Sequence, residues 1–240
     1  MNYDLENKSV LSASFPLPGE NYQLEHLLEQ NYPNGKKALI VGPVTASIVK
    51  KILNNYPELF IISDSYDSLI NIRASLKEIE AVKIKLMDYS HTDFKDNSFD
   101  LIYSQGSISV SERKNILKEM KRILTENGKL SVGEIVLLKE PVAGFVRDIW
   151  QQSGLEPLPM ATINQFYTSR GFEIVSEKDV SGSLKDYYEK ISYSFSKAGK
   201  DEKFQNKKIF SRMKHESNVY LKLGGDKYIG FKSLILRKAN

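Results

Sequence analysis

Short apolar runs recur between residues 36 and 136, and polar segments separate them. Each run is bounded by turn-forming residues, which is typical of strands buried on both faces of a parallel sheet. Five strands are therefore predicted, at residues 38–41, 59–63, 82–87, 99–103 and 130–136.

The segments between these runs have a helical spacing of apolar positions, so that their apolar side chains fall on one helix face. One such face consists of Val44, Ile48, Val49, Ile52 and Leu53. A second consists of Ile116, Met120, Ile123 and Leu124. Alternation of strands with amphipathic helices predicts an α/β fold with a doubly wound, Rossmann-like sheet.

Two regions fall outside the alternation. Residues 1–35 contain Pro16 and Pro18, a helical pattern over 20–30 and a turn at 32–35, and we expect them to form an N-terminal helical lid segment. Residues 139–163 are rich in proline and glycine and are expected to form an insertion beyond the carboxyl end of a strand. Ligands bind at that edge of open α/β sheets. The predicted organisation is thus 1–35 as the lid and 36–240 as one domain, with 139–163 as a substrate-side insertion.

Composition excludes several chemistries. The chain has no cysteine and three histidines, which rules out disulfides, thiolate zinc sites and cysteine nucleophiles, and we expect no metal site. No apolar run reaches 18 residues, and Asp4, Glu6 and Lys8 lie where a signal peptide would be apolar. A cytoplasmic protein that does not associate with membranes is expected.

Charge is distributed unevenly. Residues 1–184 carry 20 basic and 24 acidic side chains, whereas residues 185–240 carry 14 and 6. The lysines of the second part, among them Lys197, Lys200, Lys203 and Lys214, are spread out with acids between them. This pattern favours a solvated helix face over an anionic substrate or partner, and it favours nucleic acid least.

Two strand ends carry candidate binding residues. Gly42 follows the first strand, where a glycine turn allows the backbone to approach a ligand, although an ordinary tight turn would have the same sequence. It belongs to neither a phosphate loop nor a dinucleotide fingerprint, because Val44 and Ser47 stand where glycines should be. Asp64 follows the second strand, where a carboxylate can accept both hydroxyl hydrogens of a ribose. The alternative role at this position is capping the next helix, with Ser65 and Asp67 at its start.

A longer motif lies before and within the fourth strand. The stretch from Met87 to Asp100 resembles the segment Gly-Asp-Ala, three residues, Pro-Phe, one residue, Asp-Asn-Ser-Phe-Asp of class I S-adenosylmethionine-dependent methyltransferases. The matching residues are Asp88, Phe94, Asp96, Asn97, Ser98, Phe99 and Asp100. The resemblance extends through 116–130, 166–175 and 228–238, and it covers about residues 36–240. It implies a mostly parallel sheet of about seven strands, closed by an antiparallel strand.

One motif of the family is degenerate here. The family has an acid two residues before its first glycine and further glycines at alternate positions, whereas this chain has Ile40, Gly42, Val44 and Ala46. Side chains at Val44 and Ala46 would narrow the space near the methionine part of the cofactor. The cofactor would then bind in a shifted or weaker pose, or binding would be lost.

The resemblance implies S-adenosylmethionine as cofactor and assigns roles to five residues. Gly42 would allow backbone approach, Asp64 would bind the ribose hydroxyls and Asp88 the adenine amino group. Tyr89 would lie beside the adenine ring and Ser104 near the methionine end. The reaction would be in-line methyl transfer, in which alignment and desolvation supply most of the rate.

The acceptor side is less defined by the sequence. A general base would come from His91, His215, Tyr187, Tyr188 or Tyr193, although a structural role is expected for each, and the catalytic residue stays unknown. Gln105 and Trp150 are candidates for lining the acceptor pocket. The helical additions, and the lack of an aromatic-lined basic strip for RNA, favour a small-molecule acceptor and no nucleic acid.

Two alternatives stay open. The chain could be an inactive methyltransferase-like protein that serves as a partner or ligand-binding subunit, or it could use another cofactor or reaction on the same fold. Lack of cysteine excludes arsenite methylation through thiolates. The sequence carries no feature that defines an oligomeric state, so a homodimer is only the base-rate expectation.

Overall fold

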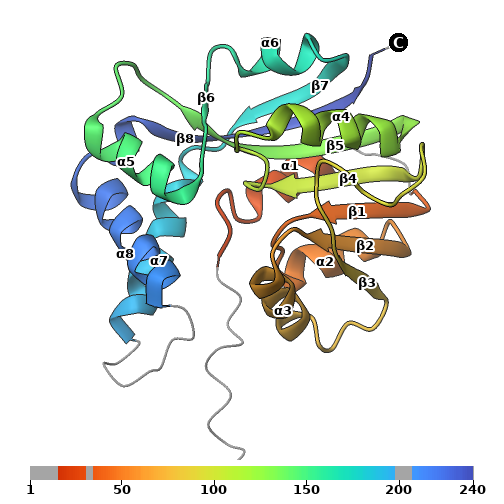
Figure 1. Cartoon of the computed structure of the whole chain (residues 1–240), viewed down its shortest axis with the longest axis horizontal. Coiled ribbons are helices and arrows are strands. Elements are labelled where there is room, and N and C mark those ends of the chain that lie inside the picture. Colours follow the sequence, from red (N-terminus) through yellow and green to blue (C-terminus); the bar gives the residue numbers. More distant parts are fainter. Residues whose placement is uncertain (1–15, 31–34, 198–206, 240) are drawn as a thin grey trace, which may run out of the picture.

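A twisted sheet runs through the molecule, with helices on both faces and a further group of helices at one end (Figure 1). The computed structural model describes residues 16–30, 35–197 and 207–239. None of the helices in these ranges is long and apolar enough to cross a membrane.

The main sheet has the strand order β3-β2-β1-β4-β5-β8-β7. Strands β1 to β5 pair in parallel, and β8 is antiparallel to both β5 and β7. A two-residue strand, β6, pairs with β5 outside this path. The strands are β1 (Lys37–Val41), β2 (Glu58–Ser63), β3 (Val82–Leu86), β4 (Phe99–Gln105), β5 (Leu124–Leu137), β6 (Leu158–Pro159), β7 (Phe172–Asp179) and β8 (Ile229–Lys238). This topology confirms the predicted doubly wound α/β fold.

All five predicted strands are present. Four of them begin and end within two residues of the predicted limits, but β5 begins at Leu124, six residues before the predicted start. The extra residues pair with the start of β4 across an irregularity between Phe99 and Leu101, where Phe99 lies opposite Leu124. The apolar pattern did not reveal this extension because its residues 125–129 are mostly polar.

Helices cover the two faces of the sheet. One face is packed by α1 (Tyr22–Leu28), α2 (Ala46–Leu53) and α3 (Tyr66–Ser75), and the other by α4 (Arg113–Ile123) and α6 (Ile163–Thr168). Thr45 and Ser65 cap the amino ends of α2 and α3, where each hydroxyl accepts a hydrogen bond from a backbone N–H three residues later. Alternate residues of each central strand therefore enter different cores.

A helical cap lies beyond the carboxyl ends of β4 and β5 (Figure 1). It consists of α5 (Gly144–Ser153), α7 (Ser183–Lys197) and α8 (Lys207–Lys222), which share an apolar cluster with the end of β5 and the start of β8. The predicted insertion at 139–163 contains α5 and β6 and thus contributes to this cap. Of the predicted lid, residues 16–30 lie against the sheet, while 1–15 and 31–34 fall outside the described residues, as do Lys200 and Lys203.

Candidate active site

Predicted binding residues meet at the carboxyl edge of four neighbouring strands. Val41, the last residue of β1, pairs with Ile62 of β2 and with Ser104 of β4. Ser63, the last residue of β2, pairs with Leu86 at the end of β3. Gly42, Asp64 and Asp88 follow these strand ends directly or by two residues. We call this region the carboxyl edge.

Gly42 occupies a position that only glycine fits. Its φ is +97°, and a Cβ on it would lie 2.0 Å from the Oγ of Ser107 and 3.7 Å from the hydroxyl of Tyr89. The backbone N–H of Gly42 donates to the carbonyl of Ile62 over 3.0 Å, which fixes the turn at the end of β1. Both the conformation and the close approach of the loop after β4 therefore require glycine.

The residues that replace the family's acid and glycines lie in the core. Ile40 and Val44 are buried in the cluster that includes Leu24 of α1, and Ala46 packs against the same cluster. The Val44 side chain is thus part of the packing of α2 against the sheet. Ser107 and Tyr89, which the sequence analysis did not associate with Gly42, are the side chains that approach it instead.

Asp64 is exposed at the end of β2. The cap of α3 is Ser65, whose Oγ accepts from the backbone N–H of Ser68 over 3.5 Å, so the Asp64 carboxylate does not cap the helix. The buried side chain of Tyr89 lies beside Asp64 and Ser63. Burial first, and then the negative charge of Asp64, raise the pKa of Tyr89 above its usual value, so the phenol stays protonated.

Asp88 is exposed and oriented by its own turn. Its Oδ1 accepts hydrogen bonds from the backbone N–H of Ser90, over 2.7 Å, and from the Ser90 hydroxyl, over 2.8 Å. These two hydrogen bonds lower the pKa of Asp88. The carboxylate is therefore ionised at neutral pH and can accept a hydrogen bond from an amino group.

Two buried polar atoms near the carboxyl edge have no hydrogen-bond partner among the described residues, namely the Oγ of Ser104 and the Oε1 of Gln23. The amide nitrogen of Gln23 donates to the carbonyl of Ser104 over 3.0 Å and to the Oγ of Ser131 over 3.2 Å. Unpaired buried polar atoms are costly in a folded protein. Both side chains are fully buried, so the Ser104 hydroxyl is an unsatisfied polar group at the carboxyl end of β4.

Gln105 holds the N-terminal segment rather than facing an open pocket. Its amide nitrogen donates to the carbonyls of Pro18 and Glu20, and its Oε1 accepts from the Tyr103 hydroxyl. The Glu20 carboxylate in turn accepts hydrogen bonds from Lys190 of α7, at 2.5 and 2.7 Å. Residues 16–20 thus connect the end of β4 with the helical cap.

Trp150 lies in the core of the cap. Its ring packs in the cluster formed by α5, α7 and α8, and its Nε1 has no hydrogen-bond partner among the described residues. Tyr188 is buried nearby, where it donates to Glu216 over 2.7 Å and stacks on Tyr220. Burial and the Glu216 carboxylate raise the pKa of both Tyr187 and Tyr188, which makes each a weak candidate for a base. Tyr193, His91 and His215 are exposed.

A buried ion pair lies on β5, next to the carboxyl end of β4. Glu134 of β5 is fully buried, and its Oε1 lies 3.1 Å from the Nε of Arg113. The same carboxylate accepts hydrogen bonds from the hydroxyls of Tyr167 and Ser109. Glu134 follows Gly133, the residue that pairs with Gln105 at the end of β4. The charged group is therefore paired, and it fixes α4 and α6 against β5.

One family model matches part of the chain. Residues 39–132 match the family described as "Methyltransferase domain". These residues include Gly42, Asp64, Asp88 and Ser104. No curated protein matches the sequence significantly.

Solved structures share the fold at low sequence identity. A candidate sarcosine dimethylglycine methyltransferase from Galdieria sulphuraria superposes with a TM-score of 0.73 at 14% identity, over 91% of this chain and 84% of that one. A second structure is phosphoethanolamine N-methyltransferase 2 from Haemonchus contortus, in complex with phosphomonomethylethanolamine and S-adenosylhomocysteine. It superposes with a TM-score of 0.78 at 16% identity, over 95% of this chain and 55% of that one. The [4+2]-cyclase SpnF superposes with a TM-score of 0.74 at 21% identity, over 92% of this chain and 82% of that one.

The likeness therefore has two parts. Residues 39–132 match the methyltransferase domain family. The fold of the whole described chain is that of solved methyltransferase structures, with TM-scores of 0.73 and 0.78.

Proposed function

We propose that this protein transfers a methyl group from S-adenosylmethionine to a small-molecule acceptor. The observation that carries the proposal is the meeting of Gly42, Asp64, Asp88 and the unpaired Oγ of Ser104 along the ends of four neighbouring strands, inside the segment that matches the methyltransferase family. A glycine with positive φ, two exposed carboxylates and a buried unpaired hydroxyl suit a nucleoside that also carries an amino acid group.

Each residue has one task in this proposal. Asp64 binds the ribose hydroxyls, and Asp88, held ionised by Ser90, accepts a hydrogen bond from the adenine amino group. Gly42 and Ser104 contact the methionine portion. When bound, the cofactor supplies a methyl group that its sulfonium charge has already activated. The protein then contributes alignment of the acceptor and exclusion of water.

In this chain, which lacks the family's further glycines, the side chains of Tyr89 and Ser107 lie next to Gly42. Tyr89 lies beside Asp64, so a ribose that binds this carboxylate displaces the phenol from it. Ser107 lies against Gly42 from the loop after β4. Both side chains move when the cofactor enters, and this requirement weakens its affinity relative to a preformed site.

The acceptor side is proposed to be the space between residues 16–20, the carboxyl edge and the helical cap. Gln105 positions residues 16–20, and Trp150 belongs to the core of the cap rather than to its surface. A site covered by α5, α7 and the N-terminal segment suits a small molecule. The Galdieria and Haemonchus neighbours, named for the methylation of small amines, support this choice. A homodimer or a partner protein stays a prediction that a measurement of the molar mass in solution would test.

A second function is favoured by one of the neighbours. The [4+2]-cyclase SpnF shares this fold at a TM-score of 0.74, although its name describes a cyclisation. A chain with Ile40, Val44 and Ala46 in place of the family's acid and glycines could use the same edge for such a reaction, or it could serve as an inactive subunit. In those cases the carboxyl edge binds a ligand but transfers no methyl group.

Calorimetric titration with S-adenosylhomocysteine and S-adenosylmethionine tests the cofactor site. We expect binding in the micromolar range, loss of binding in Asp64→Ala and wild-type binding in Asp67→Ala. The control removes an exposed acid of the same charge that lies on α3, three residues along the chain. No heat at millimolar ligand, with the far-UV circular dichroism of a folded α/β protein, would contradict the proposal.

The acceptor class has a separate test. The protein is incubated with methyl-labelled S-adenosylmethionine and a cell extract divided into fractions below and above about 1 kDa. Label transferred only in the fraction of small molecules supports the proposal, and Asp64→Ala serves as the blank. Cofactor binding without transfer in either fraction would instead support the cyclase-like or inactive function.

A further inference from the structure

We propose that a groove between α4 and the start of β7 binds a compact polyphosphate, either free or as the phosphate chain of a nucleotide. The groove has a volume of about 540 Å³ and is lined by Asp96, Asn97, Lys114, Leu117, Lys118, Lys121, Arg122, Arg170, Phe172 and Lys238. Six of these ten residues are cationic and one is acidic. This inference does not rest on the proposed methyl transfer.

The groove lies away from the carboxyl edge. Phe172 is the first residue of β7, Lys238 is the last residue of the antiparallel β8, and Asn97 comes two residues before β4 begins. All three therefore mark the amino ends of the parallel strands. Gly42, Asp64 and Asp88 lie at the opposite ends, so a ligand in the groove does not compete for the cofactor site.

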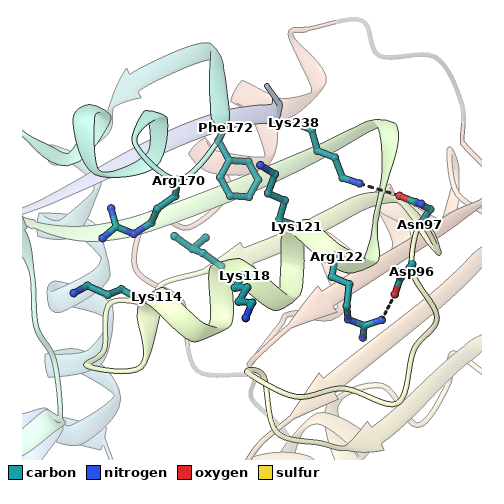
Figure 2. A pocket seen from close by; sticks show the side chains of 10 residues that line it. Asp96, Asn97, Lys114, Lys118, Lys121, Arg122, Arg170, Phe172 and Lys238 are labelled. Carbon is teal, nitrogen blue, oxygen red and sulfur yellow. Dashed lines mark hydrogen bonds and ion pairs between the residues drawn. The ribbon is translucent and has the colours of Figure 1, made fainter. Parts of the chain in front are cut away.

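Cations enter the groove from both walls. Figure 2 shows Lys114, Lys118 and Lys121 along α4, with Arg170 and Lys238 across from them. The three lysines are four and three residues apart, a spacing that places them on one face of the helix. The second wall comes from residues more than 45 positions later in the chain, so the tertiary structure assembles the groove.

Three of the lysines are available to a ligand. Within the described ranges, the side chains of Lys114 and Lys118 make no hydrogen bond or ion pair, and both residues are exposed. The ammonium of Lys121 lies 6.0 Å from the centre of the Phe172 ring and has no acidic partner there. Like charges so close together repel one another, and a bound anion would relieve this repulsion.

Gly171 admits Lys121 to the groove. The φ of Gly171 is +75°, and a Cβ at this position would lie 2.1 Å from the Lys121 Nζ. The turn between α6 and β7 therefore leaves space that the ammonium fills. Arg170 is held beside it, since its guanidinium lies 3.6 Å from the Phe166 ring centre and donates to the Phe166 carbonyl.

The remaining cations are partly neutralised and mark one end of the groove. Arg122 pairs with Asp96 over 2.6 Å, and Lys238 donates to Asn97 over 2.8 Å (Figure 2). Lys238 also donates to Glu126 over 2.8 Å. At the other end, Glu112 precedes α4 and is exposed. The groove cations without an acidic partner among the described residues are thus the three lysines of α4 and Arg170 opposite them.

The limited length of the cationic stretch on α4 favours a short anion. Lys121 follows Lys114 by seven positions, a helical rise of roughly 10 Å, which is about the length of a triphosphate chain. A nucleic acid strand would have to continue past Glu112 or past the Asp96 and Glu126 carboxylates, which repel phosphate. A flat membrane surface would not reach a hollow with cations on both walls. The charge density and the volume, which lies within the usual range for small-molecule sites, favour a compact polyphosphate.

The test is calorimetric titration of the full chain with sodium tripolyphosphate and, separately, with ATP, in low salt without Mg²⁺. We expect one site per chain and weaker binding at high salt, since exposed charges are screened. Lys118→Gln/Lys121→Gln should weaken binding about tenfold. The matched control is Lys50→Gln/Lys77→Gln, which removes two exposed lysines from other surfaces and should bind as the wild type does.

Several outcomes would overturn the proposal. These are no binding of tripolyphosphate at millimolar concentration by the folded protein, equal weakening in both double variants, and binding only to a single-stranded oligonucleotide or to phosphatidylserine vesicles. S-adenosylhomocysteine titrations on the same variants keep the two sites apart. Loss of polyphosphate binding with unchanged S-adenosylhomocysteine binding would place the anion in the groove.

Discussion

The side-chain amide of Gln105 donates hydrogen bonds to two backbone carbonyls, over 2.9 Å to Pro18 and 2.8 Å to Glu20. The two partners lie more than 80 positions earlier in the chain, on a segment that precedes β1. Gln105 itself is 2% exposed. The amide at the end of β4 therefore fastens Pro18 and Glu20 to the carboxyl edge.

Gln105→Glu should release this segment, because a carboxylate cannot donate to the two carbonyls and repels them. Leaving these partly buried carbonyls unpaired costs at most about 1–3 kcal/mol of stability. Hydrogen–deuterium exchange should become faster in residues 16–30 and stay unchanged in β1 and β2. Gln152→Glu, on the exposed side of α5, is the control. Unchanged exchange in residues 16–30 would show that Gln105 does not hold them.

Gly42→Ala should weaken cofactor binding and lower stability together. A Cβ would lie 2.0 Å from the Ser107 Oγ, and the φ of +97° is unfavourable for alanine, at a cost of about 1–3 kcal/mol. Gly182→Ala is the control, since a Cβ there meets no atom within 4 Å. Titration with S-adenosylhomocysteine and urea unfolding measure both effects. Wild-type affinity and stability in Gly42→Ala would contradict the geometry described for the turn.

Adding Ser107→Gly to Gly42→Ala separates the two causes. The contact with the serine hydroxyl is removed, but the strained φ stays. We expect partial recovery of stability, and the remaining deficit measures the backbone strain alone. No recovery in the double variant would show that Ser107 moves aside without cost.

Arg113→Met should destabilise the protein strongly, because it leaves the carboxylate of Glu134 buried without its cation. Breaking one side of a buried ion pair costs about 3–5 kcal/mol. The double variant Arg113→Met/Glu134→Gln should recover part of this loss, since no charge is then left in the core. Urea unfolding of the wild type, of Arg113→Met, of Glu134→Gln and of the double variant completes a double-mutant cycle. A double variant no more stable than Arg113→Met would show that the ion pair is not the main interaction of Arg113.

Stability should decrease below neutral pH through His26. Its ring nitrogens lie 2.8 Å from the hydroxyls of Ser233 and Ser176. Burial lowers the pKa of His26, Lys178 lowers it further, and Glu29 partly opposes them. The unfolded chain therefore binds more protons just below pH 6.5, so this contribution is complete above that pH and is lost as the pH falls towards the folded pKa.

The measurement is the free energy of unfolding at pH 7.5 and 5.5. His26→Gln should show a smaller difference between the two values than the wild type, because glutamine does not titrate. His91→Gln, at an exposed position, should keep the wild-type difference. Equal pH dependence in all three proteins would exclude His26 as the source.

The sequence by itself determined the sheet and the residues at its carboxyl edge. Strand and helix periodicities are local properties, so the apolar runs located five strands. The carboxyl ends of neighbouring parallel strands share one edge, and this rule brings Gly42, Asp64 and Asp88 together without knowledge of the packing. The motif from Met87 to Asp100 indicated the family, because its residues are contiguous in the chain.

The tertiary structure alone decided what surrounds those residues. Three contacts join segments whose relative placement depends on how loops and helices pack. These are the contacts of Ser107 with Gly42, of Tyr89 with Asp64 and of Gln105 with Pro18. The spacing of Lys114, Lys118 and Lys121 is present in the sequence, but their groove also requires Arg170 and Lys238, which the order of β5, β8 and β7 brings opposite α4. A linear pattern defines one helix face, and only the folded sheet provides the second wall.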